Sequence, residues 1–276
     1  MSKIKSSVLF AVLLTAAIFA TYISIKTTAQ QTQAGPAADN EYQIGAVLYF
    51  QTAAENRALF YQAFELAKLR LDQKLKECEK LKKKLPCAVV TDIDETALDN
   101  SPNLAFLIKN RRASNADDWQ KWFDMQAAKP LPGALEFFKY AASKNIRVFY
   151  VSNREAAQKS ATVGNLQKAG FPDASDETVL LRAETSSKEP RRQMIAQKHR
   201  IVMLLGDNLN DLAQVFERKS ITDRFAAVDN LKADFGSRFI VLPNPMYGEW
   251  ESAIYDYARR TDEEKATLRR NALQSY

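Results

Sequence analysis

The amino-acid sequence predicts an α/β protein built on a parallel β-sheet that helices cover on both faces. Between residues 147 and 242, short apolar runs alternate with segments of helical periodicity, and this alternation is typical of βαβ units. Residues 88–92, Ala-Val-Val-Thr-Asp, form a further apolar run of the length of a buried strand. Hydrophobic residues make up 46% and charged residues 26% of the 276 positions, as in folded globular proteins. A chain of this length could form one domain with a small additional structural element, or two small domains.

The amino terminus has the order of a secretory signal. Lys3 and Lys5 precede an apolar run at residues 8–25, and a polar stretch follows it. We expect residues 1–29 to be a signal peptide that is cleaved near the Thr-Thr-Ala sequence at residues 27–29, with a linker at residues 30–40. The run is nearly long enough to span a bilayer, so an uncleaved anchor is the alternative. In either case we expect export to the periplasm or cell envelope, with membrane contact only through this segment.

The net charge argues against a nucleic acid polymer as a partner. The formal charge is +6, and three lysines fall in the first 29 residues, which hold no acidic residue. Removing that segment leaves +6 − 3 = +3, which is too mild for a nucleic-acid-binding surface.

The first part of the chain is predicted to be helical. Residues 41–84 have apolar positions at helical spacing and form one long helix or two, ended by Pro86. Residues 102–129 are helical but less regular. We expect the segments at about 41–84 and 102–130 to build a small helical cap. The apolar stripe of the first segment consists of Leu59, Phe60, Ala63, Phe64, Ala67 and Leu71.

The remaining elements follow in strict order, and they belong to a core expected at residues 86–101 and 131–245. A helix from Pro132 to Ser143 begins this part, and helices at residues 249–276 follow it. Between them we expect strands at residues 147–151, 178–181, 201–205 and 239–242, and helices at residues 155–169 and 188–198.

Three of the predicted strands end in polar residues. The pairs are Asp92 with Asp94, Ser152 with Asn153, and Asp207 with Asp211. The carboxyl ends of parallel strands lie along one edge of a sheet, so these side chains should converge. The i, i+2 spacing of Asp92 and Asp94 sends both to the same side of an extended backbone, where they repel each other unless a cation lies between them or one holds a proton.

The converging oxygen atoms indicate a site for Mg²⁺, because hard cations prefer carboxylate ligands. Phosphoryl transfer needs such an ion together with donors that hold the phosphoryl oxygens. The single histidine, His199, lies in the basic run of residues 198–200, where we expect it to be exposed and without function. Ser-His-Asp hydrolysis, histidine phosphatase chemistry and multi-histidine zinc sites are therefore disfavoured.

Two cysteines, Cys78 and Cys87, are the only ones in the sequence. In an exported chain such a pair can form a disulfide, and two unlinked thiols are the alternative.

The polar strand ends resemble the four motifs of the haloacid-dehalogenase superfamily phosphatases. They are Asp-Ile-Asp-Glu-Thr at 92–96, Ser-Asn-Arg at 152–154, Lys188, and Gly-Asp-Asn-Leu-Asn-Asp at 206–211. From about Gln43 to the carboxyl end the chain is similar to the class C bacterial acid phosphatases, the lipoprotein acid phosphatase and 5′-nucleotidase family. Further matching segments are residues 57–64, 119–122, 148–154 and 243–248. The resemblance implies a Rossmann-like, haloacid-dehalogenase-like core with a smaller helical cap.

The resemblance also implies a role for each site residue. Asp92 would be the nucleophile and a Mg²⁺ ligand. Asp94 would be the general acid and then the general base, with its backbone carbonyl on the metal. Asp207 would complete the protein ligands, and Asp211 would hold the site from close by. The phosphoryl oxygens would be bound by Ser152, Asn153 and Lys188, and a nucleobase would stack between Trp119 and Tyr247. We ourselves assign Trp122 to packing.

The chain departs from the family at three points. Asn210 and Leu212 stand where the family usually has Asp and Phe, and no cysteine follows the apolar amino-terminal run, so a lipid anchor is not expected. From the residues themselves we expect Asp94 to keep a proton at mildly acidic pH, because it follows a carboxylate that metal would neutralise.

We therefore expect an exported Mg²⁺-dependent acid phosphatase that hydrolyses nucleoside 5′-monophosphates through an aspartyl-phosphate intermediate. A broad phosphatase or phosphotransferase without base preference is one alternative. A surface binding protein with incidental phosphatase activity is another. The oligomeric state, a monomer or a homodimer, is left open.

Overall fold

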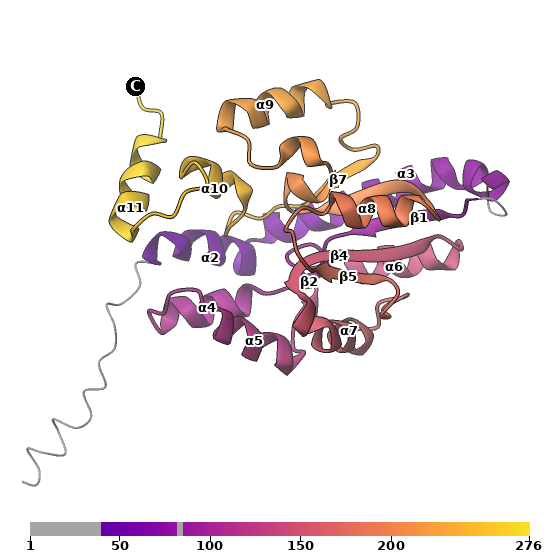
Figure 1. Ribbon diagram of the computed structural model, residues 1–276, viewed down its shortest axis with the longest axis horizontal. Coiled ribbons are helices and arrows are strands. Elements are labelled where there is room, and N and C mark those ends of the chain that lie inside the picture. The colour runs from indigo at the N-terminus through magenta and orange to yellow at the C-terminus, as the bar shows by residue number, and fades with distance from the viewer. Residues whose placement is uncertain (1–39, 82–84) are drawn as a thin grey trace, which may run out of the picture. The chain divides into compact units, whose positions relative to one another are not determined.

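A five-stranded parallel sheet forms the centre of the structure, a computed structural model that describes residues 40–81 and 85–276 (Figure 1). The strand order is β5-β4-β1-β6-β7, and each neighbouring pair is parallel. The predicted α/β class with a parallel sheet is confirmed. The strands are β1 (Cys87–Thr91), β4 (Arg147–Glu155), β5 (Val179–Arg182), β6 (Arg200–Gly206) and β7 (Phe239–Val241).

The register of the sheet brings the three polar strand ends together. β1 is buried along its whole length, and Val90 lies opposite Phe149 of β4 and Leu204 of β6. Because β1 lies between β4 and β6 and runs parallel to both, all three strands lead out at the same edge. The ladder continues past β1, where the Asp92 N–H donates to the Leu205 carbonyl at 3.0 Å.

Alternating strand residues divide the apolar core between the two faces of the sheet. Val89 and Met203 point to the larger cluster, where helices α3 (Ala54–Leu81), α6 (Ala134–Ser143) and α7 (Lys159–Lys168) contribute Phe60, Phe138 and Leu166. Val90 and Leu204, one residue further along each strand, point to the smaller cluster, which includes Ile195 of α8 (Glu189–Ala196). The period of two residues on a strand places neighbours on opposite faces.

A group of helices lies to one side of the sheet. It contains the 3₁₀ turn η1 (Glu41–Gln43), α2 (Ile44–Thr52), α4 (Ser101–Lys109) and α5 (Ala116–Met125), and α4 packs against both α2 and α5 (Figure 1). Two short antiparallel strands that the sequence did not predict, β2 (Leu98–Asp99) and β3 (Lys129–Pro130), tie the ends of the α4–α5 segment together. Strands of two residues are too short to leave a periodic pattern.

Several element boundaries differ from the prediction. β4 runs on to Glu155 instead of ending at residue 151, because residues 152–155 stay extended beside β5. The helix expected at 155–169 therefore starts as a 3₁₀ turn, η2 (Ala156–Gln158), before α7. Between β6 and β7 the prediction missed further elements. These are η3 (Leu209–Asp211), η4 (Gln214–Phe216) and α9 (Ile221–Asn230). The carboxyl-terminal helices are α10 (Glu249–Ile254) and α11 (Asp262–Asn271).

His199 is half-buried, not exposed as the sequence predicted. It follows α8 and precedes β6, and this short connection turns its ring against Phe149, with ring centroids 4.9 Å apart in an edge-on arrangement. Burial and the nearby Arg147 lower the pKa of the imidazole. The histidine packs against the smaller core cluster and lies outside the cavity described below.

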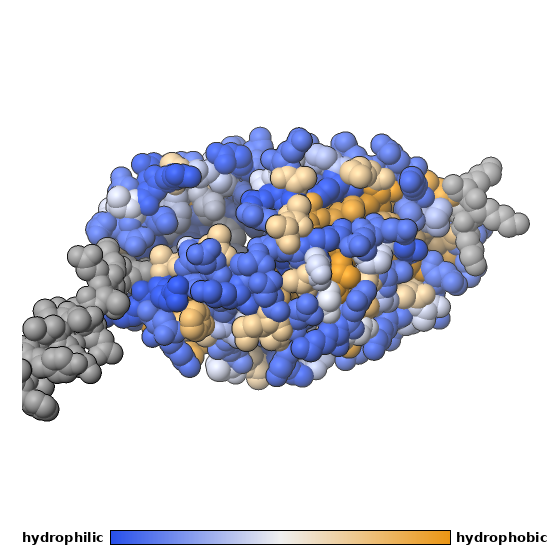
Figure 2. Space-filling model, turned by 60° about the horizontal axis from the view of Figure 1, so that its bottom comes forward, coloured by the Kyte–Doolittle hydropathy of each residue, from blue (hydrophilic) through white to orange (hydrophobic). Residues whose placement is uncertain are grey.

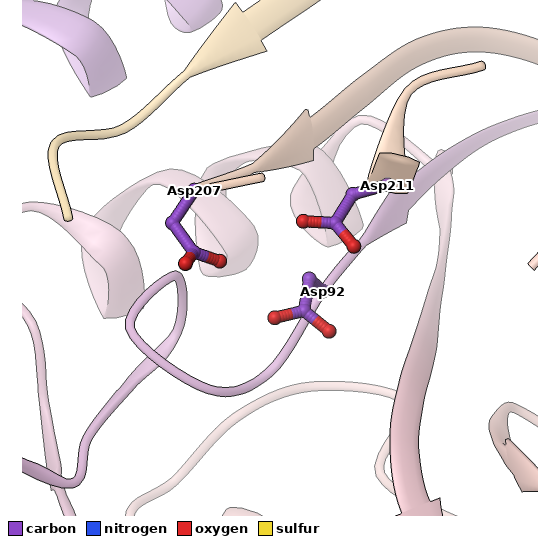
Figure 3. Close-up of side chains that lie close together, drawn as sticks. All are labelled: Asp92, Asp207 and Asp211. Carbon is purple, nitrogen blue, oxygen red and sulfur yellow. The ribbon is translucent and has the colours of Figure 1, made fainter. Parts of the chain in front are cut away.

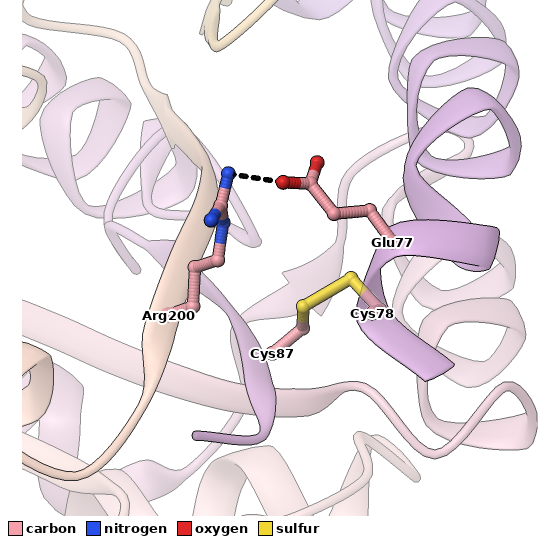
Figure 4. The surroundings of a disulfide bond; sticks show 4 residues. All are labelled: Glu77, Cys78, Cys87 and Arg200. Carbon is pink, nitrogen blue, oxygen red and sulfur yellow. Dashed lines mark ion pairs between the residues drawn. A yellow bond between two sulfur atoms is a disulfide. The ribbon is translucent and has the colours of Figure 1, made fainter. Parts of the chain in front are cut away.

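A disulfide joins Cys78, near the end of α3, to Cys87, the first residue of β1 (Figure 4). The two Cα atoms are 5.5 Å apart, within the usual range for such a bond. Beside it, Glu77 of α3 and Arg200 of β6 form an ion pair at 2.6 Å. The end of α3 is thus fixed to β1 and β6 at the edge opposite the polar strand ends.

The expected signal or anchor at residues 1–29 lies outside the described residues, as does most of the expected linker. Within residues 40–81 and 85–276, no helix is both long enough and apolar enough to cross a membrane. Figure 2 shows one face of the molecule, on which hydrophilic residues predominate and apolar residues form smaller patches.

Candidate active site

Three carboxylates meet at the carboxyl edge of the sheet. Asp92 follows β1, Asp207 follows β6, and Asp211 lies in η3 (Figure 3). One oxygen of each side chain lies within 4.8 Å of the other two. Asp92 and Asp211 are both 7% exposed, so water does little to separate their charges.

The turn after β6 needs a glycine to bring Asp211 into this cluster. A Cβ atom at Gly206 would lie 2.4 Å from the Cβ of Asp211, far inside contact distance. Asp211 then accepts a hydrogen bond from the Asn208 N–H at 3.0 Å, which caps η3. The glycine in the Gly-Asp-x-x-x-Asp sequence therefore lets both aspartates point the same way.

Lys188 places a buried ammonium group inside the cluster. It lies directly before α8, and its Nζ forms ion pairs with Asp92 and, at 2.6 Å, with Asp211. Burial by itself would lower the pKa of Lys188, but the two carboxylates outweigh burial and raise it. The lysine is therefore charged and held in place from both sides.

One lysine does not neutralise three carboxylates. Burial, together with repulsion from Asp211 and Asp207, raises the pKa of Asp92 well above its ordinary value, although Lys188 opposes this. Burial and Asp211 also raise the pKa of Asp207 to about 7. A cluster that is short of positive charge and rich in carboxylate oxygens fits a divalent cation such as Mg²⁺. Asp207 is already oriented, since Thr96 and Asn244 donate to its two oxygens at 3.1 and 2.8 Å.

Asp94 is held by a second set of donors. Arg154 Nη2 lies 2.7 Å from its Oδ1, Ser152 Oγ donates to Oδ2 at 3.0 Å, and Asn100 Nδ2 donates to Oδ1 at 2.7 Å. Burial would raise the pKa of Asp94, but Arg154 and these hydrogen bonds outweigh burial and lower it. Without a metal, Asp94 therefore favours the ionised form. The expectation that it keeps a proton at mildly acidic pH assumes a metal ion on Asp92, and it stays a prediction.

The predicted phosphate-binding residues do not all face the same space. Asn153 and Lys188 line the cavity in front of the carboxylates. Ser152 is fully buried, and its hydroxyl is directed to Asp94 and accepts from the Arg154 N–H at 3.1 Å. The structure thus brings Ser152 to the candidate acid, and not into the cavity.

The cavity has a volume of about 390 Å³. Asp92, Asp94, Asp207 and Lys188 line it, and so do both predicted stacking residues, Trp119 and Tyr247. Further lining residues that the prediction did not include are, among others, Phe123, Arg154, Gln158 and Arg182. A space of this size, lined by both charged groups and aromatic rings, suits a phosphate ester with a flat leaving group.

The two aromatic side chains are held differently. Trp119 donates from Nε1 to Ser114 Oγ at 2.9 Å, and its ring packs on Phe123 at a centroid distance of 5.4 Å. The hydroxyl of Tyr247 donates to the carboxylate of Glu95. Trp122 packs against the core as expected and also donates to Asn100 at 2.8 Å, which in turn holds Asp94.

Sequence reasoning assigned no role to Arg154, Glu95, Asn100 or Asn244. The importance of Arg154 could have been inferred from the sequence. It belongs to the Ser-Asn-Arg motif at the end of a predicted strand, and an arginine that is buried there needs an acidic partner. Glu95 is fully buried and has a left-handed backbone with φ 56°. Burial and the neighbouring Asp94 raise the pKa of Glu95. Nothing in the sequence pattern indicates that its side chain turns inward.

Comparisons with known proteins point to one family. The family model described as HAD superfamily, subfamily IIIB (acid phosphatase), matches residues 7–250. The class C acid phosphatase from Bacillus anthracis has a similar structure, with a TM-score of 0.80 and 42% sequence identity over 85% of this chain and 98% of that chain. The structure of the class C acid phosphatase from Bacillus anthracis with tungstate bound has a TM-score of 0.78 at 41% identity, with the same coverage.

Two plant proteins are more distant relatives. Acid phosphatase 1 of Solanum lycopersicum is 28% identical over 166 residues, which are 57% of each chain. The stem 31 kDa glycoprotein of Glycine max is 26% identical over 161 residues, 56% of this chain and 57% of that protein. The chain therefore spans less than two thirds of the length of these curated relatives.

Proposed function

The chain belongs to the acid phosphatase family of the HAD superfamily, subfamily IIIB, and on this premise we propose that it is a Mg²⁺-dependent phosphomonoester hydrolase that acts on nucleoside 5′-monophosphates. One observation carries this proposal. The cavity lining combines the carboxylate of Asp92 with the ammonium group of Lys188 and the further carboxylate of Asp207. A group able to attack phosphorus and a positive charge thus lie together where a phosphate group would enter.

Asp92 would attack the phosphorus atom with a carboxylate oxygen and form an aspartyl phosphate, while the bond to the leaving alkoxide breaks. Lys188 and Asn153 would bind the phosphoryl oxygens, since both line the cavity beside Asp92. A water molecule would then attack the aspartyl phosphate, releasing phosphate and restoring the carboxylate of Asp92.

Asp94 would donate a proton to the leaving alkoxide and then accept one from the attacking water. A phosphate ester brings negative charge close to Asp94, which opposes the effect of Arg154 and favours the protonated form. Arg154 and Asn100 would hold the carboxyl group in position during both steps, since each donates to Oδ1 at 2.7 Å.

The carboxylates of Asp92 and Asp207 would hold Mg²⁺, together with the backbone carbonyl of Asp94 that the family resemblance implies. When bound, the ion offsets the negative charge of the phosphoryl group. Thr96 and Asn244 support this task, because they fix the two oxygens of Asp207. Asp211 would stay close to Asp92 through their shared partner Lys188.

The leaving group would extend past the carboxylates toward Trp119 and Tyr247, which line the same cavity. Aromatic rings bind nucleobases by stacking, and this contact tolerates different bases. The disulfide between Cys78 and Cys87 supports export, because such bonds persist in oxidising compartments.

Release of inorganic phosphate from a nucleoside 5′-monophosphate and from an aryl phosphate tests the proposal. Activity should disappear after chelation and return with Mg²⁺ but not with Ca²⁺, because Ca²⁺ prefers more ligands at longer distances. The nucleotide should have the higher kcat/KM. Full activity after exhaustive chelation would contradict the metal requirement. Equal kcat/KM for both esters would favour a phosphatase without base preference, and metal-dependent release of neither ester would contradict the proposed activity.

A further inference from the structure

Two consecutive arginines on α8 are buried behind the candidate active site. Arg191 is 8% and Arg192 is 4% exposed, and neither lines the cavity. Successive residues on a helix point about 100° apart, so the two guanidinium groups reach different neighbours. Both follow closely after Lys188, whose ammonium group lies in the carboxylate cluster.

Arg191 binds the last part of β4. Its Nη1 donates to the Ser152 carbonyl at 2.6 Å, and its Nη2 donates to Asn153 Oδ1 at 2.7 Å. The same Nη2 also donates to the Ser187 carbonyl at 3.0 Å, directly before Lys188. Arg191 therefore joins Asn153 and Lys188, the two residues expected to bind the phosphoryl oxygens.

Arg192 binds the backbone of η3, which carries Asp211. Its Nη1 donates to the carbonyls of Asn210 and Asp211 at 3.0 and 2.8 Å. Its Nε and Nη2 are held by one carboxylate oxygen of Glu189, at 3.1 and 2.8 Å. Arg192 therefore fixes η3, and with it the position of Asp211 in the acidic cluster.

These contacts depend on the shape of the guanidinium group. Its planar fork donates in several fixed directions at once, which a lysine ammonium group on a flexible chain does not reproduce. The carbonyls of Ser152 and Asp211 receive charged donors in buried surroundings, where such hydrogen bonds are strong. Replacing either arginine by lysine would keep the charge and loosen one segment, the end of β4 for Arg191 or η3 for Arg192.

We infer that Arg191 and Arg192 are positioning residues with separate tasks, Arg191 for phosphate binding and Arg192 for the place of Asp211 in the acidic cluster around the Mg²⁺ site. This inference rests on the proposed function and deepens it. Neither arginine lines the cavity, so each acts through the segment that it holds. The two effects should separate because one segment is the end of β4 and the other is η3, which follows β6.

The test compares Arg191→Lys, Arg192→Lys and the control Arg70→Lys. Arg70 also donates to a backbone carbonyl, that of Gly236 at 2.7 Å, but this contact lies outside the cavity lining. Two constants are measured for each protein. One is the dissociation constant of Mg²⁺ by calorimetry without substrate, and the other is the inhibition constant of inorganic phosphate at saturating Mg²⁺.

Arg192→Lys should weaken Mg²⁺ binding by about 10- to 100-fold, the usual effect of losing a group that orients metal ligands, and change the phosphate constant less than about twofold. Arg191→Lys should weaken phosphate binding by about tenfold and leave the Mg²⁺ constant within about twofold. Arg70→Lys should change neither. If Arg191→Lys or Arg192→Lys changes both constants by similar factors, or changes neither constant, the inference that the two arginines have separate tasks is wrong.

A further variant covers the case in which Arg192→Lys does not fold. Glu189→Gln leaves Arg192 in place and weakens only its support, and the Glu189 side chain is partly exposed. Glu189→Gln should also weaken Mg²⁺ binding, by a smaller factor than Arg192→Lys. An unchanged dissociation constant for Mg²⁺ would count against the inference. Wild-type protein that neither binds Mg²⁺ nor releases phosphate would contradict the proposed function itself. Binding and turnover by the wild type without the split between variants would contradict only the inference.

Discussion

Arg154 holds the carboxylate of Asp94 with two nitrogens, Nη2 at 2.7 Å from Oδ1 and Nε at 3.2 Å from Oδ2. The guanidinium group also lies over the ring of Phe123 on α5, 3.9 Å from its centroid. The arginine therefore links the candidate acid to the helix that carries Trp119. Its charge is the main reason why the pKa of Asp94 is lowered in spite of burial.

Arg154→Gln should move the acidic limb of the pH–rate profile to higher pH. Without the guanidinium charge, burial raises the pKa of Asp94, and the deprotonated base that the second step needs is lost at a higher pH. The shift should be about one pH unit or more, since a neighbouring arginine usually lowers such a pKa by one to three units. Arg182→Gln is the matched control, because Arg182 lines the same cavity but pairs with Glu155. An acidic limb that does not move in Arg154→Gln would show that Asp94 does not limit the rate.

The parallel sheet and the meeting of Asp92 and Asp207 could be predicted because they follow from pattern and topology. Apolar runs that end in aspartate mark the strands, and parallel strands bring their ends to one edge. The family resemblance then singled out Lys188 among many lysines. None of these steps requires the direction of a side chain.

Contacts that depend on side-chain direction could not be predicted. Ser152 and Arg154 are two residues apart on an extended strand, so both reach Asp94, and the Ser152 hydroxyl is used there. The donors that lower the pKa of Asp94 were missed for this reason. The inward turn of Glu95, at φ 56°, likewise depends on the tertiary contact with Tyr247.

Trp119→Ala should lower kcat/KM for a nucleoside 5′-monophosphate by about tenfold or more. Stacking of a base on an aromatic ring contributes roughly 1 to 3 kcal/mol, and Trp119 lies in the cavity wall away from the reacting atoms. A small ester without a base should react at nearly the wild-type rate. Trp250→Ala, at a tryptophan that is 44% exposed on α10, should leave both substrates unaffected. Equal loss on both substrates in Trp119→Ala would make Trp119 a packing residue of α5.

The metal-free protein should lose stability as the pH rises toward neutral. The pKa of Asp207 is raised to about 7 in the fold, whereas an aspartate in the unfolded chain titrates near pH 4. Between these values the folded chain binds a proton that the unfolded chain has released. The stability from this group is therefore complete below about pH 4 and is lost as the pH rises through 7. Mg²⁺ binding should release this proton, so its affinity should rise with pH over the same range.

Denaturant unfolding of metal-free protein between pH 4.5 and pH 8 measures this effect. Asp207→Asn is the comparison, since an amide does not titrate and should flatten the part of the pH dependence that belongs to this residue. The same pH dependence of the free energy of unfolding in both proteins would contradict the assignment.

The disulfide should stabilise the fold without changing the chemistry. Closing the short loop between Cys78 and Cys87, nine positions apart, contributes roughly 2 to 3 kcal/mol by chain entropy. The double variant Cys78→Ser/Cys87→Ser should lower the free energy of unfolding by about that amount and keep kcat within about twofold. Thiol titration of the denatured, unreduced wild type should find no free thiol. Two free thiols would show that the cysteines are not linked.

Replacement of Asp92 by asparagine tests the central claim most directly. The amide cannot form an aspartyl phosphate, and it keeps nearly the size and shape of the carboxylate beside Lys188. Steady-state release of phosphate from a nucleoside 5′-monophosphate with saturating Mg²⁺ should fall to background in Asp92→Asn. Its circular dichroism spectrum should stay that of the wild type. Turnover within about tenfold of the wild type would show that Asp92 is not the nucleophile.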